Sequence, residues 1–257
     1  MPDFADDDLT GSRFDDVILT GAHFRRVYLT NARFEAVDLT GAFRGVDLVD
    51  VEVSGDINNL SINGVDVAPL IDAELDRRYP DRAKMRPTDA DGFREAWSLL
   101  EQLWGHTVER ARTMPSASLH ERVGGEWSFI ETLRHLVFAT DAWVRRAILG
   151  EPSSWDRLDL PHAEMEDMPN IPRDRNATPS LDVVLALRDD RAAAVRQVLA
   201  DLTDDALGEM TTPVSEPGYP ASESFPISQC LRIVLNEEWQ HRLYAERDLD
   251  ALDSGAT

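Results

Sequence analysis

The chain has 257 residues, of which 42% are hydrophobic, so it is long enough for one large domain or two smaller ones with buried cores. Its formal net charge of −22 argues against the clustered basic surface that phosphate backbones require, and we expect no nucleic-acid partner. The same charge disfavours anionic membrane surfaces, and no apolar run is long enough to cross a membrane.

The amino terminus and the cysteine content both favour the cytoplasm. Residues 1–8 lack the basic start and the apolar stretch of a signal peptide. Cys230 is the single cysteine, which excludes an intramolecular disulfide and agrees with a reducing compartment. We therefore expect a cytoplasmic protein in which Cys230 is a small buried hydrophobic residue rather than a nucleophile.

Residues 4–39 carry a phenylalanine or a leucine at every fifth position, a period that neither a helix nor a strand has. A small or branched residue stands two positions earlier, and Thr-Gly or Thr-Asn follows the leucines, as in Leu19-Thr20-Gly21. The pattern resembles the pentapeptide-repeat family, whose fold is a right-handed quadrilateral β-helix with ~20 residues per coil. The resemblance implies that the central Phe and Leu side chains fill the interior. These centres are Phe4, Leu9, Phe14, Leu19, Phe24, Leu29, Phe34 and Leu39.

The repeat weakens after its eighth centre. One residue is missing near Ala42-Phe43, and the pattern fades through Leu48 and Val53. The expected first domain is therefore a short pentapeptide-repeat β-helix of roughly three coils at residues 1–67. A solenoid leaves an open strand edge at each end, so we expect residues 57–65 to cap it or to connect it to the next domain.

A connector separates the repeat from a helical region. Residues 68–89 contain three prolines and a charged stretch, and we expect a linker with a short helix from Pro69 to Tyr79. Beyond the linker, apolar residues recur at helical spacing in four segments of roughly 20 residues. They predict an all-α four-helix bundle over residues 90–250, followed by a disordered tail at 251–257. The first helix begins near Thr88, and the others cover 128–149, 180–202 and 227–249.

Two local signals accompany the second predicted helix. Ser128, with Glu131 three residues later, forms a capping box at its start. The stretch after the helix, from Glu151 to Pro179, is long and proline-rich, and unstructured connectors of this length are often functional. We expect this connector to cover one end of a pocket.

The last predicted helix interrupts its apolar stripe with a carboxylate and an imidazole. Alternating steps of four and three residues place Cys230, Val234, Glu237, His241 and Tyr244 on one helix face. Burying a carboxylate and an imidazole costs several kcal/mol unless a charge or a hydrogen bond compensates, and a divalent metal is one compensator. The stripe therefore makes Glu237 and His241 candidate metal ligands.

A further ligand is needed from another helix, and His135 is the strongest candidate because it lies in the most apolar helical segment of the chain. For a lone inward histidine, a hydrogen-bonded core position is the usual interpretation. Two such histidines with Glu237 favour a metal site about equally with a metal-free arrangement, in which Glu237 is hydrogen-bonded to His135 or His241.

Several segments resemble the DinB-like superfamily: Glu126-Trp127-Ser128, His135-Leu136, and Asn-Glu-Glu-Trp-Gln-His at 236–241. That superfamily includes metal-dependent transferases and isomerases that use low-molecular-weight thiols such as bacillithiol and mycothiol. Its usual site is one histidine on the second helix and a His-x-x-x-His pair on the fourth. The resemblance implies that His135 and His241 are ligands and that Glu237 stands where the middle histidine is expected. Two histidines and a glutamate suit zinc, and equally nickel, manganese or iron.

The expected function is a metal-dependent transferase or isomerase that joins a small thiol to an electrophilic substrate. The metal would lower the pKa of the bound thiol and make a thiolate available at neutral pH. Glu238 is the candidate catalytic residue, as a proton acceptor or by orienting a ligand histidine, although a solvated helix face is the more ordinary interpretation. Mycothiol is the favoured thiol because arginine-rich usage, with Lys84 the single lysine, is typical of GC-rich genomes.

The alternative is a non-catalytic interaction protein that uses the acidic repeat for partner docking or for homodimer formation. Residues 1–66 carry 13 acidic and 5 basic side chains, a net charge of −8 out of −22, so the acidity is not concentrated there. At ~4.8 Å per coil, three coils make a stub of roughly 15 Å, too short to imitate much duplex DNA. Docking or dimerisation is therefore favoured over DNA mimicry.

Overall fold

The computed structural model describes residues 4, 7–14, 17–34, 37, 39–53, 57, 59–163, 165–168 and 170–255. The chain divides into two compact units, Met1–Val49 and Asp50–Thr257, and each is described by itself. This division lies earlier than the boundary predicted at residue 67. The reason is that residues 60–67 form a hairpin that passes directly into the first helix of the second unit.

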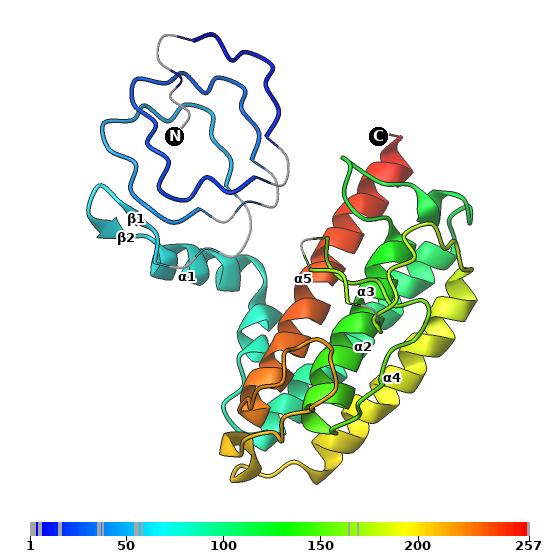
Figure 1. Ribbon diagram of the computed structural model, residues 1–257. Helices are drawn as coiled ribbons and strands as arrows, with labels where there is room; N and C mark the ends of the chain where they lie inside the picture. The colour runs from blue at the N-terminus through cyan, green and yellow to red at the C-terminus, as the bar shows by residue number, and fades with distance from the viewer. Residues whose placement is uncertain are drawn as a thin grey trace. The chain divides into compact units, whose positions relative to one another are not determined.

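In the first unit the described chain winds through successive coils with a turn every ten residues (Figure 1). In each turn the carbonyl of Leu9, Leu19 or Leu29 accepts the amide three residues later, at 2.9 to 3.1 Å. A positive φ at the third turn position is the type II geometry that requires glycine or asparagine. The residues there are Gly11, Gly21 and Asn31, with φ of +76°, +75° and +59°. The Thr-Gly and Thr-Asn pairs of the repeat therefore specify its turns.

The side chains at the centres of the repeat are exposed, so the expectation that they fill an interior is wrong for the described residues. The exposed fraction is 59% for Phe14, 63% for Phe24 and 58% for Phe34. Among the described residues of this unit, the backbone hydrogen bonds lie within turns, and none joins one coil to the next. Without a ladder between coils, neighbouring coils do not close over the central side chains.

The second unit begins with a β-hairpin. Strand β1 (Ser61–Ile62) pairs antiparallel with β2 (Val65–Asp66). The turn residues Asn63 and Gly64 have φ of +50° and +82°, which is the type I′ geometry that Asn-Gly favours. Helix α1 (Ala68–Arg78) follows, close to the range 69–79 predicted for it, and a 3-10 segment (Pro80–Met85) leads on to the longer helices.

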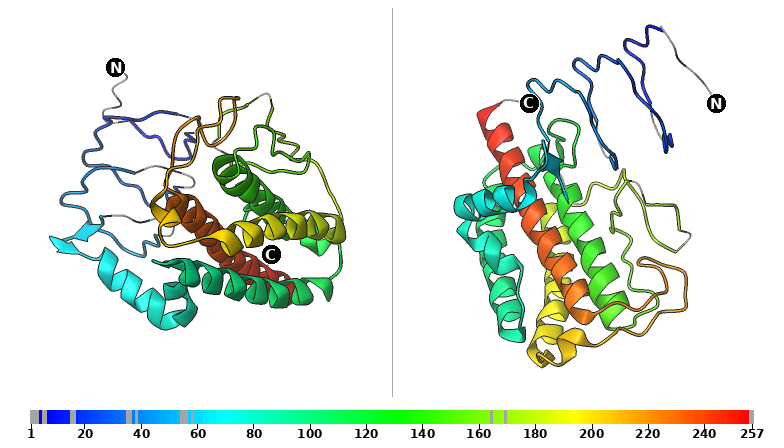
Figure 2. Two further views of the ribbon diagram at one scale, coloured as in Figure 1. Left: turned by 90° about the horizontal axis from the view of Figure 1, so that it is seen from below. Right: turned by 90° about the vertical axis from the view of Figure 1, so that its left-hand side faces the viewer.

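Long helices form the rest of this unit, with their axes side by side in Figure 1 and in the right-hand view of Figure 2. Helix α3 packs on both α4 and α5, and α2 packs on α5, while α2 and α4 touch less closely. This confirms the helical carboxy-terminal region that the sequence predicts. None of the helices in the described part of the chain is long and apolar enough to span a membrane. The bounds are α2 (Ala90–Arg112), α3 (Phe129–Thr140), α4 (Leu181–Asp201) and α5 (Ile227–Ser254).

The capping box at the start of α3 is confirmed. The Ser128 hydroxyl accepts the Glu131 amide at 3.3 Å, and the Glu131 carboxylate accepts the Ser128 amide at 2.9 Å. Helix α3 does not continue as a regular α-helix to residue 149, however, because residues 141–148 are π-helical. Asp141 begins that segment fully buried, and Arg191 of α4 donates to both of its oxygens at 2.9 and 2.8 Å. This bidentate pair ties the end of α3 to α4.

The end of α5 corrects the predicted tail. The helix continues through Ser254 and ends at Gly255, whose φ of +67° is the left-handed conformation typical of a helix end. Residues 251–254 are therefore helical rather than disordered, and residues 256 and 257 lie outside the described residues.

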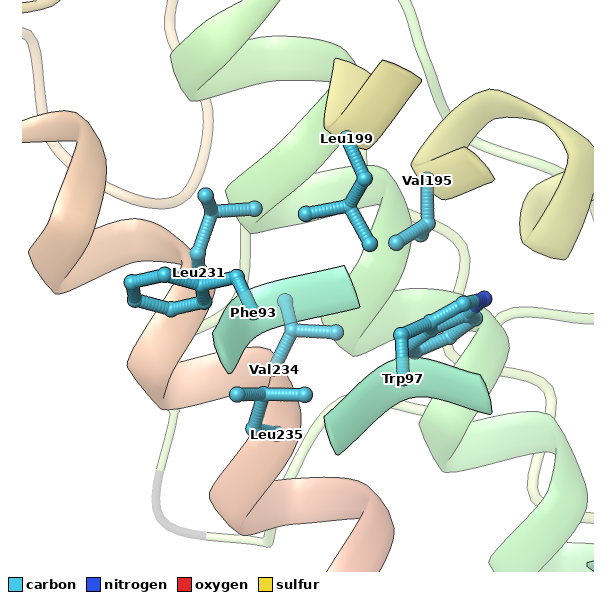
Figure 3. Close-up of a pocket in the computed structure, with 7 residues that line it drawn as sticks. All are labelled: Phe93, Trp97, Val195, Leu199, Leu231, Val234 and Leu235. Atoms are coloured by element: carbon cyan, nitrogen blue, oxygen red, sulfur yellow. The ribbon is translucent and has the colours of Figure 1, made fainter. Parts of the chain in front are cut away.

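The core between α2, α4 and α5 is closely packed. Side chains from these helices converge on a void of only about 10 Å³ (Figure 3). A void needs roughly 10–15 Å³ and several polar partners to hold a water molecule, and this apolar lining offers no such partners. The void is therefore dry and the helices are fixed against one another. Its lining residues are Phe93, Trp97, Val195, Leu199, Leu231, Val234 and Leu235.

Two long connectors cover the α3–α5 side of the unit, away from α2 (Figures 1 and 2). Two buried arginines hold these connectors in place. Arg134 of α3 is 0% exposed, and Arg146 of the π-helical segment that follows α3 is 2% exposed. Each guanidinium donates to backbone carbonyls of one connector, although Nη1 of Arg146 has no partner among the described residues. Arg134 bonds the carbonyls of Leu158, Asp174 and Ala177, and Arg146 those of Val214, Glu216 and Pro220.

Candidate metal centre

The three predicted ligands, His135, Glu237 and His241, come together between α3 and α5, with one ligand atom of each within 4.8 Å of the others. The Oε2 atom of Glu237 is 3.2 Å from Nε2 of His135 and 3.3 Å from Nδ1 of His241. The two imidazole centroids are 4.8 Å apart. The structure therefore assembles the constellation that the sequence predicts.

Helix geometry and burial explain how these side chains meet. Glu237 and His241 lie one turn apart on α5 and so share a face. His135 lies in the middle of α3, a helix whose residues are all buried. The side chain of His135 is 7% exposed, while those of Glu237 and His241 are 29% and 17% exposed. The cluster thus has a buried imidazole on one side and solvent access on the other.

Backbone carbonyls orient both imidazoles. Nδ1 of His135 lies 2.9 Å from the carbonyl oxygen of Leu160, and Nδ1 of His241 lies 3.0 Å from that of Glu237. A carbonyl oxygen only accepts, so each Nδ1 carries the proton, and in a neutral ring Nε2 keeps its lone pair. A carbonyl partner on the second ring nitrogen is typical of histidines that bind metals. Nε2 of His135 therefore keeps a lone pair directed at the Glu237 carboxylate, whereas the ring nitrogen of His241 nearest that carboxylate is Nδ1.

The charges in the cluster call for a cation. Burial raises the pKa of Glu237, but the hydrogen bond with His135 and the charge of His135 lower it by more, so the carboxylate is ionised at neutral pH. Burial and the neighbouring His135 lower the pKa of His241 to about 4, so that its imidazole is neutral. If His135 were neutral, its Nε2 and the Glu237 carboxylate would face each other as two hydrogen-bond acceptors with no proton between them. A metal ion between them, or a proton on His135, removes this conflict.

The donor set fits a divalent transition metal. Two bonds of about 2.0–2.2 Å at a tetrahedral angle hold their ligand atoms about 3.4 Å apart. The 3.2 Å between His135 Nε2 and Glu237 Oε2 is close to that value. Imidazole nitrogen and carboxylate oxygen suit zinc, nickel, manganese and ferrous iron, so the donor types do not select one metal among them.

Aromatic side chains border the cluster on its helical side. The Trp127 ring lies 4.5 Å from His135 and 5.9 Å from His241, between centroids. The ring of Tyr244 meets His241 edge-on at 5.9 Å. Sequence reasoning placed Trp127 in a family-like segment and Tyr244 on the α5 stripe. The structure adds that Trp127 contacts both imidazoles, whereas Tyr244 contacts His241 alone and is 39% exposed.

The connectors supply Tyr219, which the sequence did not single out, and His162 of the long connector that was expected to cover a pocket. Tyr219, from the loop before α5, is near enough for the charge of Glu237 to add to burial in raising the pKa of its hydroxyl. The ring of His162, from the 151–180 connector, lies edge-on to Tyr219 at 5.7 Å. The proline-rich sequence around Tyr219 predicts a turn and nothing more specific. No sequence pattern marks the Leu160 carbonyl as the partner of His135, because every residue has a backbone carbonyl.

Glu238 lies outside the cluster, contrary to the catalytic role predicted for it. Its side chain is buried, and its Oε2 accepts a hydrogen bond from Arg188 of α4 at 2.8 Å. Consecutive residues on a helix point about 100° apart, so Glu238 faces α4 while Glu237 faces His135. Its carboxylate is therefore committed to Arg188, and neither the expected contact with a ligand histidine nor the solvated face is observed.

Cys230 agrees with the structural role predicted from sequence. Its side chain is fully buried near the start of α5, and burial raises the pKa of its thiol to about 11. The thiolate is the nucleophilic form of cysteine, so Cys230 supplies no nucleophile at neutral pH.

Family comparisons cover both parts of the chain. A family model described as the DinB superfamily matches residues 99–245, and a model of pentapeptide repeats matches residues 8–45 in eight copies. No curated protein and no solved structure matched the chain. The first match contains His135, Glu237 and His241 and spans more than half of the sequence, and the second contains the five-residue period. Both resemblances seen in the sequence are thereby confirmed.

Proposed function

The chain belongs to the DinB superfamily, and on that premise we propose that its helical domain is a metal-dependent enzyme. Its metal is a divalent transition ion held by His135, Glu237 and His241. One observation carries the proposal: these side chains converge from two helices, with both imidazoles fixed through Nδ1 by backbone carbonyls. If His135 served packing alone, its Nε2 would not need to face the Glu237 carboxylate, since both atoms are hydrogen-bond acceptors when the ring is neutral.

When bound, such a metal lowers the pKa of a coordinated thiol and so makes a thiolate available at neutral pH. The protein contributes orientation and exclusion of water. The Leu160 carbonyl fixes the ring of His135, and the carboxylate of Glu237 brings the negative charge of the donor set. Trp127 and Tyr219 limit the access of water and present ring surfaces to a substrate.

The finer proposal is a transferase or isomerase in which a low-molecular-weight thiol of the mycothiol type attacks an electrophilic substrate. Two features support an external thiol. The chain's single cysteine is buried and stays protonated, so the nucleophilic sulfur must come from a small molecule. The side chain of Glu237 is 29% exposed, which leaves one side of the cluster open to such a molecule.

Elemental analysis of the untagged full-length protein tests the metal site. We expect about one equivalent of transition metal per chain, since the cluster offers one set of ligands. His241→Ala is expected to lose it, whereas His106→Ala, which removes an exposed histidine from α2, is expected to retain it. Protein that stays metal-free after incubation with zinc, nickel, manganese and ferrous iron would overturn the enzyme proposal.

Thiol consumption in the presence of several electrophiles then tests the reaction class. We expect mycothiol loss with the metal-loaded protein and none with His241→Ala. Stoichiometric metal without any thiol consumption would leave the metal site standing and reject the thiol-dependent reaction.

A further inference from the structure

A cavity of about 280 Å³ is lined mainly by residues of α2 and α4. Thr140 of α3 and Glu238 of α5 line it together with residues of α2 and α4, and His135, Glu237 and His241 do not. Thr140 is 3% exposed and Glu238 is 2% exposed, so these two polar side chains form the inner end of the cavity.

The walls of this α2–α4 cavity are mainly apolar and aromatic. An engineered cavity of about 150 Å³ in another protein holds one benzene ring, and pockets for drug-sized ligands start near 300 Å³. The volume here therefore suits a molecule of about two fused rings. The apolar wall residues are Trp97, Leu100, Trp104 and Val108 of α2 and Leu185 and Ala192 of α4.

Two indole groups and the guanidinium of Arg188 belong to the lining of this cavity. The indole Nε1 atoms of Trp97 and Trp104 are buried and have no hydrogen-bond partner among the described residues. Each such buried donor costs about 1–3 kcal/mol relative to a satisfied one. Arg188 adds further donors, because its guanidinium lies 5.1 Å over the Trp104 ring and bonds Glu238 through one terminal nitrogen. The indole nitrogens have almost no accessible surface, so the N–H groups of Arg188, whose side chain is 15% exposed, are the donors that an acceptor on a ligand can reach.

The charges around the cavity cancel. Arg196 of α4 pairs with Glu101 of α2 at 2.5 Å across the outer rim, and Arg188 pairs with Glu238 at the inner end. A lining without net charge gives no preference for an ionic ligand. The charged lining residues are Arg188, Arg191, Arg196, Glu101, Asp189 and Glu238.

Gly105 leaves the mouth of the cavity open. It lies in the interior of α2, where glycine costs roughly 0.5–1 kcal/mol relative to alanine. Packing does not demand it, because an added Cβ would meet no atom within 4 Å. The missing side chain keeps a path into the space between Trp104 and α4.

We infer that the α2–α4 cavity is a second ligand site, separate from the metal cluster, for a small uncharged aromatic molecule that carries a hydrogen-bond acceptor. The wall residues take the rings, and the guanidinium of Arg188 takes the acceptor. This inference is independent of the proposed enzymatic function, since no metal ligand lines the cavity.

Quinoline and naphthalene test the inference on the full-length protein. They have nearly the same shape, and only quinoline, uncharged at neutral pH, carries an acceptor. Titrations are followed through the indole N–H signals in proton–nitrogen correlation spectra, assigned with Trp97→Phe, Trp104→Phe and Trp127→Phe. Quinoline is expected to shift the signal of Trp97 or Trp104 saturably and to leave that of Trp127 unmoved. Naphthalene is expected to bind about fivefold more weakly, the worth of one hydrogen bond.

A matched pair of variants on α4 locates the binding. Ala192 lines the cavity, and the next residue, Ala193, is exposed. Ala192→Phe is expected to weaken quinoline binding at least tenfold by filling the space, and Ala193→Phe is expected to leave it unchanged. If Ala192→Phe fails to fold, Gly105→Leu occludes the mouth instead. Absence of a saturable shift, equal binding of naphthalene, a response at Trp127, or full binding by the occluded variant would each overturn the inference.

Discussion

The two faces of α5 employ consecutive glutamates in different ways. Glu237 faces α3 and shares its carboxylate with His135 and His241, with 29% of its side chain exposed. Glu238 faces α4, is buried, and pairs with Arg188. The residue type is the same and the positions differ by one, so the different outcome comes from what each neighbouring helix presents.

The comparison shows what compensates the carboxylate charge on each face. Beside Glu238, the guanidinium of Arg188 supplies the positive charge that a buried carboxylate requires. Beside Glu237 stand imidazoles, and the pKa of His241 is lowered to about 4, so that ring gives no charge at neutral pH. An ionised carboxylate among neutral donors is a ligand set, whereas a carboxylate with a guanidinium is a completed ion pair.

The largest expected effect is on stability, and it distinguishes the two faces. Glu238→Ala leaves the guanidinium of Arg188, which is 15% exposed, without its partner and is expected to lower the free energy of unfolding by about 3 kcal/mol. Glu237→Ala, measured in metal-free protein, is expected to change it by less than about 1 kcal/mol, because a partly exposed carboxylate is removed. Urea unfolding in a chelator measures both variants. An equal loss for the two would contradict the contrast between them.

For metal affinity, the larger effect is expected at Glu237 and the smaller one at Glu238. Loss of a supporting residue alone weakens metal binding 10- to 100-fold, so removal of the ligand charge in Glu237→Gln is expected to weaken it at least about 100-fold. Glu238→Gln keeps the shape of its side chain, lies outside the cluster, and is expected to stay within about threefold of the unchanged protein. Zinc titration against a competing chelator measures both constants. Comparable losses would show that Glu238 supports the metal after all.

Much of this arrangement was predictable because its causes are local. Apolar spacing and turn residues place helices at 180–202 and 227–249, and the structure has Leu181–Asp201 and Ile227–Ser254. The polar interruption of the α5 stripe identifies Glu237 and His241 as inward residues, and the structure brings His135 to them. A helix face follows from a period, so ligands on such a face can be read from sequence.

What the sequence could not predict depends on contacts distant along the chain. Tyr219 and the Leu160 carbonyl reach the site only because Arg134 and Arg146 hold the connectors through backbone carbonyls. Such bonds have no residue-type signature, because every residue offers a carbonyl. The partner of Glu238 likewise depended on which residue of α4 lies opposite, which spacing within α5 does not specify.

The smallest expected effect concerns the glycine on the α4-facing side. Gly105→Ala is expected to raise the free energy of unfolding by up to about 1 kcal/mol, because alanine loses less backbone entropy in a helix and its Cβ meets no atom within 4 Å. Ala193→Gly, the reverse exchange at an exposed position of α4, is expected to cost a similar amount and calibrates the measurement. Metal affinity should not change in either variant, since both positions lie away from the cluster.

If Gly105→Ala destabilises the protein, close packing requires the glycine, and the open mouth of the α2–α4 cavity loses its explanation. If it stabilises the protein, α2 keeps a residue that costs stability at the mouth of the cavity, as expected where an opening for a ligand is maintained.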